Sequence, residues 1–110
     1  MFTIDLYNTL NKKLEELTTS VKSLRITATE YAEAYRNYRI LLAKKLAQLK
    51  ADGMAITLAS DIARGDEEIA NAKMVEIKKE AIYKANMESI NAIKLEIKII
   101  ENQITREIGL

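Results

Sequence analysis

Apolar residues return every three or four positions between Tyr7 and Leu49. In heptad notation, the first column contains Tyr7, Leu14, Val21, Ala28, Tyr35, Leu42 and Leu49. The second column contains Leu10, Leu17, Leu24, Tyr31, Tyr38 and Lys45. A period of about 3.5 residues held over this length is typical of a helix that packs along another helix. We therefore expect a long helix over residues 3–50.

A second long helix is predicted over residues 67–108, and its apolar positions form two stripes. One stripe contains Ile69, Tyr83, Met87, Ile90, Ile97, Ile100, Ile104 and Ile108. The neighbouring stripe contains Met74, Ile77, Ala81, Ala85, Ala92, Leu95 and Ile99. Two stripes are wider than the surface that one partner helix covers. We expect the surplus to be buried in a homodimer with a four-helix arrangement.

The connector at residues 51–66 is predicted to be structured. Gly53 suits the left-handed position after a helix, Thr57 suits the N-cap of a short helix over Leu58–Arg64, and Asp66 suits the N-cap of the next helix. We expect the larger apolar residues of the connector to fold over the end of the helix pair; these are Met54, Ile56, Leu58 and Ile62.

These elements predict an all-α fold with a single domain at residues 1–110. The two long segments have similar lengths and the connector reverses the chain, so an antiparallel, coiled-coil-like hairpin is expected. Pairing the two segments along their lengths then places Tyr35 near Tyr83, Ala28 near Ile90, and Leu14 near Ile104. This register puts apolar residues opposite apolar residues, as a packed seam requires.

Composition narrows the function classes. The chain of 110 residues has 48% hydrophobic and 30% charged residues, which fits a helical bundle. Its net charge of +1 gives no overall attraction to nucleic acid or to a membrane surface. It contains neither Cys nor His, so the thiolate nucleophile, the commonest general base and the commonest metal ligands are all missing. We expect no catalytic residues, no metal site and no cofactor.

Targeting signals are not apparent. The sequence MFTIDLYNTLNKK at the amino terminus lacks the basic and apolar regions of a signal peptide. No apolar run approaches the roughly 20 residues of a membrane-spanning helix. A cytoplasmic protein without a membrane partner is the expectation.

The connector holds the first candidate binding site, formed by Asp61, Arg64 and Asp66. Charged side chains on a loop carried by a rigid scaffold are often recognition residues, so these three are candidates for binding a partner protein. The alternative is local stapling, in which Arg64 bridges to Asp61 and Asp66 caps the following helix.

Basic residues on the first helix are candidates for an alternative, nucleic-acid-binding role: Arg36, Arg39, Lys44 and Lys45. Arg36 and Arg39 lie among three tyrosines, which would suit base stacking beside phosphate-binding cations. However, the tyrosines occupy heptad positions typical of a core. The basic pairs elsewhere along the chain alternate with glutamates, as on a solvated helix face.

Two stretches carry a resemblance, GMAITLASDIARGDEEIANAKM and the ending INAIKLEIKIIENQITREIG. They resemble small uncharacterised helical proteins of bacteriophages and prophages of Gram-positive bacteria, over about the last two-thirds of the chain. The resemblance implies an accessory protein of the early phage region, acting in the cytoplasm of the infected cell. In shape alone, the predicted hairpin resembles the Gam-type inhibitors of host nucleases.

Two function hypotheses result. The first is a non-enzymatic protein that binds and inhibits a host or anti-phage defence factor. The second is a nucleic-acid-binding accessory of phage recombination or replication.

Overall fold

The computed structural model describes residues 2–109, apart from the side chain of Phe2. These residues form α1 (Phe2–Ala51), α2 (Ile56–Gly65) and α3 (Glu67–Glu107), with no strand among them. The all-α helical hairpin with a short connecting helix is therefore confirmed.

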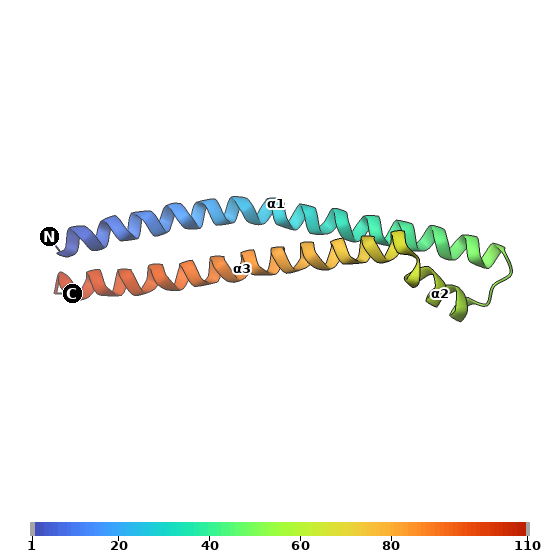
Figure 1. Cartoon of the computed structure of the whole chain (residues 1–110). Coiled ribbons are helices and arrows are strands. Elements are labelled where there is room, and N and C mark those ends of the chain that lie inside the picture. Colours follow the sequence, from blue (N-terminus) through green and yellow to red (C-terminus); the bar gives the residue numbers. More distant parts are fainter. Residues whose placement is uncertain (1, 110) are drawn as a thin grey trace. The chain divides into compact units, whose positions relative to one another are not determined.

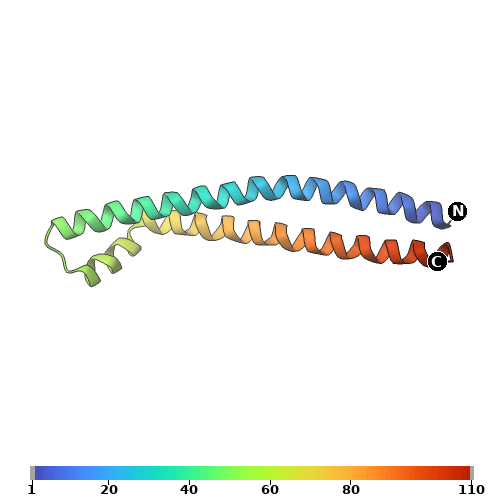
Figure 2. The same cartoon turned by 180° about the vertical axis from the view of Figure 1, so that it is seen from behind.

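The chain falls into two compact units. The first contains α1 up to Ile26 and α3 from Tyr83 onward. The second is Thr27–Ile82, which holds the rest of α1, all of α2 and the beginning of α3. Within each unit, α1 and α3 lie side by side and run in opposite directions (Figures 1 and 2).

The end of α1 follows from one glycine. Gly53 has a φ of 84°, the left-handed region that disfavours side chains with a Cβ. The Gly53 N–H donates to the Lys50 carbonyl at 3.0 Å, and the Met54 N–H donates to the Leu49 carbonyl at 3.1 Å. This pair of bonds is a Schellman motif, which satisfies two carbonyls that the helix leaves without partners.

The beginning of α2 differs from the prediction. Ala55 is extended, with φ −61° and ψ 142°, and α2 starts at Ile56 without a side-chain cap. Thr57 lies inside the helix, so its assignment as the N-cap was wrong. The first bond of α2 runs from the Ala59 N–H to the Ala55 carbonyl, at 2.9 Å.

The register of α1 against α3 also differs from the prediction, by about one heptad. In the second unit, Tyr38 contacts Lys73 and Lys45 contacts Asp66. Tyr35 is therefore level with the region of Glu76, about seven residues before the expected Tyr83. In the first unit, Lys13 contacts Glu96, so the expected pairing of Leu14 with Ile104 is wrong by a similar amount.

The connector accommodates this offset. Because Lys45 lies beside Asp66, α3 begins about two turns before the end of α1 at Ala51. The last turns of α1 pack instead on a core that includes Ala63 of α2 (Figure 1). The buried members of this core are Leu42, Ala63 and Ile69, and the half-buried ones are Tyr38, Leu41, Leu46 and Leu49.

The faces that the helices bury match the predicted columns only in part. On α1, the second heptad column is half-buried from Leu10 to Lys45, whereas Tyr7, Leu14, Val21 and Tyr35 of the first column are exposed. On α3, the first stripe supplies Ile90, Ile97, Ile100 and Ile104 to the core of the first unit, together with Ile93. Large residues of the second stripe are exposed in each unit: Met74, Ile77, Leu95 and Ile99. The homodimer that would cover them stays a prediction.

Candidate interaction site

The short helix α2 is oriented with its small side chains inward. Ala59 and Ala63 are fully buried, with 0% of their surface exposed. Ile56, Leu58 and Ile62 are 63%, 54% and 41% exposed. The expectation that the larger residues fold over the helix pair is therefore wrong for these three, whereas Met54 is half-buried. Since alanine has the smallest apolar side chain, its face lets the backbone of α2 approach α1 and α3 closely.

Leu58 and Ile62 are four residues apart in α2 and so lie on one side of it. We call these two residues the outer face of α2. Asp61 is exposed and lies three residues after Leu58, next to this face. The outer face is thus an apolar pair beside a carboxylate, carried by a helix whose alanine face is anchored in the core of the second unit.

The structure separates the three charged candidates of the connector. Asp61 and Arg64 are both exposed, and no ion pair joins them within the described residues. The predicted bridge between Arg64 and Asp61 is therefore wrong. Arg64 instead lines a surface pocket with Tyr38 and Lys73.

Asp66 has the predicted capping role. Its Oδ1 accepts hydrogen bonds from the Glu68 and Ile69 backbone N–H groups, at 3.1 and 3.4 Å. Its Oδ2 lies 3.6 Å from Lys45 Nζ. Since both carboxylate oxygens make contacts within the second unit, Asp66 mainly positions the start of α3, and it is less suited to contact a partner than Asp61.

Tyrosine and carboxylate side chains meet in the second unit. The Tyr31 hydroxyl donates to Glu80 Oε2 at 2.7 Å, and this hydrogen bond is the main reason that the pKa of Tyr31 is raised to about 12. Lys73 Nζ lies 2.7 Å from Glu76 Oε2 and 4.7 Å from the centre of the Tyr38 ring. Contact with Glu76 raises the pKa of Lys73.

These contacts occupy two of the three tyrosines that were considered for base stacking. Tyr31 and Tyr38 are half-buried and engaged with α3, and only Tyr35 of the three is exposed. Two of the three rings are therefore not presented as free faces for bases.

The basic candidates for nucleic-acid binding differ in exposure and in ion pairing. Arg36, Arg39 and Lys44 are exposed on α1. Lys45 is half-buried and paired with Asp66. A surface for phosphates would therefore have three of the four predicted cations.

Two features of this region were missed from the sequence. The outer face of α2 was missed because Leu58 and Ile62 repeat every four residues, and so do Ala59 and Ala63. Both faces are apolar, so the pattern does not tell which one is buried. The spacing of the alanines was the available signal for close helix packing.

The second missed feature is Glu76, a carboxylate with 5% of its surface exposed, within the apolar stripe of α3.

Other sites are not apparent. The described part of the chain holds no group of three or more acidic, His or Cys side chains arranged for a metal ion. As far as the structure describes them, the helices offer no stretch of the length and hydropathy needed to cross a lipid bilayer.

Comparison with protein-family models, curated proteins and solved structures finds no match to this chain. The resemblance to phage proteins and to Gam-type inhibitors therefore stays a prediction.

Proposed function

We propose that this chain is a non-enzymatic protein-binding module that contacts a partner protein through the outer face of α2. One observation carries the proposal: a ten-residue helix buries its alanines and exposes its largest apolar side chains. Folding alone favours burial of the larger side chains, since transfer from water is worth ~1.5–3 kcal/mol for a Leu or Ile. Exposed apolar clusters beside charged residues are typical of interaction sites.

The charged residues next to this face support recognition of a protein. Asp61 and Arg64 are exposed on α2, and neither has an ion-pair partner within the described residues. A rim of charges around an apolar contact excludes wrong partners more than it adds affinity. The predicted resemblance makes a host or anti-phage defence protein the proposed partner, and obstruction of that protein the proposed activity.

The test is capture of a protein from nuclease-treated bacterial lysate by the immobilised full-length chain. Leu58→Ser with Ile62→Ser should abolish capture of that protein. The loss of two half-exposed apolar contacts should weaken binding at least ~10-fold. Because both side chains are exposed, the variant should keep its helical circular-dichroism signal.

A matched control is available on α3. Leu95 and Ile99 are also four residues apart and are 60% and 50% exposed. The variant Leu95→Ser with Ile99→Ser should capture the same protein as the unmodified chain. Equal capture by all three chains would overturn the proposal.

The same material tests the nucleic-acid alternative. A protein interface should survive physiological salt, whereas binding through phosphates should weaken steeply between low and physiological ionic strength. Sub-micromolar DNA binding at physiological salt, lost in Arg36→Ala with Lys44→Ala, would favour the alternative.

A further inference from the structure

The apolar periodicity of α1 and α3 does not define their register. A shift of seven residues moves a helix by two turns and returns every heptad column to the same face. The predicted register satisfies the same apolar columns, although it lies about one heptad from the observed one. Another set of interactions must therefore distinguish the two.

Polar side chains that join α1 to α3 provide this distinction in the second unit. Glu30 Oε2 lies 2.8 Å from Lys79 Nζ, in an ion pair with hydrogen-bond geometry. Next to it is the 2.7 Å bond from Tyr31 to Glu80. Toward the connector, Lys73 lies over the Tyr38 ring, and Lys45 pairs with Asp66. We call these four pairs the polar register contacts.

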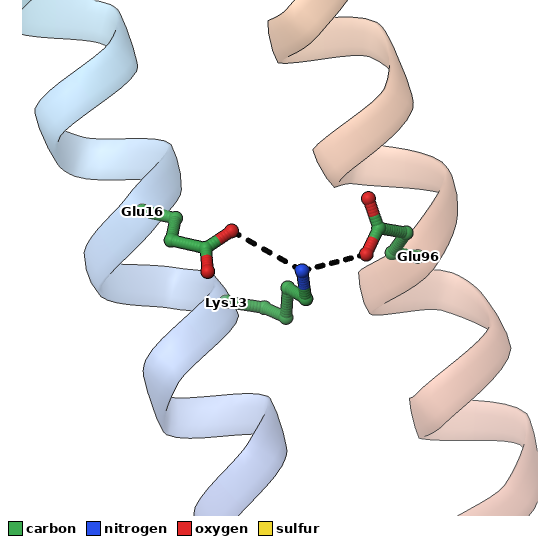
Figure 3. Close-up of polar contacts among 3 residues, drawn as sticks. All are labelled: Lys13, Glu16 and Glu96. Carbon is green, nitrogen blue, oxygen red and sulfur yellow. Dashed lines mark hydrogen bonds and ion pairs between the residues drawn. The ribbon is translucent and has the colours of Figure 1, made fainter.

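The first unit shows a similar offset by itself. Lys13 Nζ lies 2.7 Å from Glu96 Oε2 and 3.2 Å from Glu16 Oε2, so one ammonium joins carboxylates of both helices (Figure 3). These hydrogen bonds, with that to Glu96 first, raise the pKa of Lys13. The Asn86 amide donates to the Ser20 carbonyl at 3.1 Å.

A slip of one heptad, to the predicted register, would break these pairs. Lys45 would leave Asp66 and face Lys73, so an ion pair would be replaced by repulsion between two ammonium groups. Leu42, which shares a core cluster with Ile69, would face Glu76. Leu42 would thereby exchange an apolar contact for a carboxyl-bearing side chain, which loses part of its hydrophobic stabilisation. Such penalties on the wrong arrangement are a recognised source of structural specificity.

We propose that the polar register contacts select the register of this hairpin, and that its competing register is the one in which Lys45 faces Lys73. The apolar columns hold the helices together in either register. Lys45 and Tyr31 are the central residues in this selection, because Lys45 faces Asp66 and Tyr31 faces Glu80 only in the observed register.

The absence of cysteine allows a direct test with paired cysteine substitutions. Leu42→Cys with Ile69→Cys reports the observed register, and Leu42→Cys with Glu76→Cys reports the slipped one. In the observed register, the second pair is offset by about 10 Å along the helices, and disulfides require Cα atoms within ~7 Å. Intramolecular disulfide yield is measured by non-reducing electrophoresis at low protein concentration.

Each reporter pair is placed in three backgrounds. The first is otherwise unmodified, and the second carries Lys45→Glu with Tyr31→Phe. The third carries Lys44→Glu with Tyr35→Phe, which makes the same chemical changes at exposed positions. Since the slipped reporter removes the Glu76 carboxylate in all three, their comparison isolates the polar register contacts.

Lys45→Glu places a carboxylate opposite Asp66 in the observed register and opposite Lys73 in the slipped one. The second background should therefore raise the yield of the slipped disulfide, relative to the observed one, at least ~10-fold. The first and third backgrounds should form the observed disulfide almost alone.

An unchanged ratio in the second background, with the helical signal retained, would overturn the proposal. It would show that docking of α2 sets the register. Should that background lose its helical signal, Lys45→Glu alone is measured, and an unchanged ratio there would equally overturn it.

Discussion

Asp66→Ala removes the side chain that joins the start of α3 to α1 in the second unit. It takes away the acceptor of two α3 amides and the partner of Lys45. Loss of an N-cap carboxylate costs ~1 kcal/mol. The ion pair contributes ~0.5 kcal/mol, because both side chains are 31% exposed and solvent screens them. The expected loss of unfolding free energy is ~1.5 kcal/mol, with a fall in Tm of roughly 5–10 °C.

Asp66→Asn separates the two contributions. Asparagine caps a helix about as well as aspartate, but it does not form the ion pair with Lys45. This variant should lose only ~0.5 kcal/mol of unfolding free energy. The difference between the two variants therefore measures the contribution of the cap to stability. Urea titration followed by circular dichroism at 222 nm gives both free energies.

Two results would refute this reasoning. Equal losses for the two variants would show that the hydrogen bonds to the start of α3 contribute nothing. A double-mutant cycle with Lys45→Ala should give a coupling of ~0.5 kcal/mol. A coupling above ~1.5 kcal/mol would show that solvent screens this pair far less than its exposure implies.

Two further outcomes are expected. Ile97→Ala should lower the unfolding free energy by ~2–5 kcal/mol in urea, because Ile97 is buried, whereas Ile99→Ala, at an exposed position, should cost less than ~1 kcal/mol. Equal losses would contradict the assigned core. The bond to Glu80 raises the folded-state pKa of Tyr31 from 10.0 to about 12, so its stabilisation is complete below pH 10.0 and is lost as the pH rises toward about 12. Tyr31→Phe should therefore show a smaller fall in Tm than the unmodified chain between pH 9 and 12, and identical falls would refute the assignment.

The helices were predictable because their signals are local and repeated. Heptad columns mark α1 and α3, and Gly53 and Asp66 mark ends whose hydrogen bonds involve only neighbouring residues. The register was not predictable in the same way, because a heptad pattern matches itself after every seventh residue. Selecting the right match requires knowing which polar side chains meet across the helices, and that information is not local.

The exposure of side chains on α2 was predicted only in part. Asp61 and Arg64 are exposed on α2 as expected, yet the apolar pair beside Asp61 was assigned to the interior. The two faces of α2 differ in side-chain size and not in polarity, so a pattern of apolar and polar positions cannot rank them. Only the close approach of Ala59 and Ala63 to the core distinguishes them.

The orientation of α2 has a consequence for how this protein can evolve. The positions that hold α2 in place are alanines, and those that face outward make little contribution to the core. Under the proposed function, substitutions at Leu58 and Ile62 would alter partner preference while leaving the fold intact. A lineage under pressure from a changing partner could therefore vary its recognition surface rapidly, without first acquiring compensating mutations elsewhere in the chain.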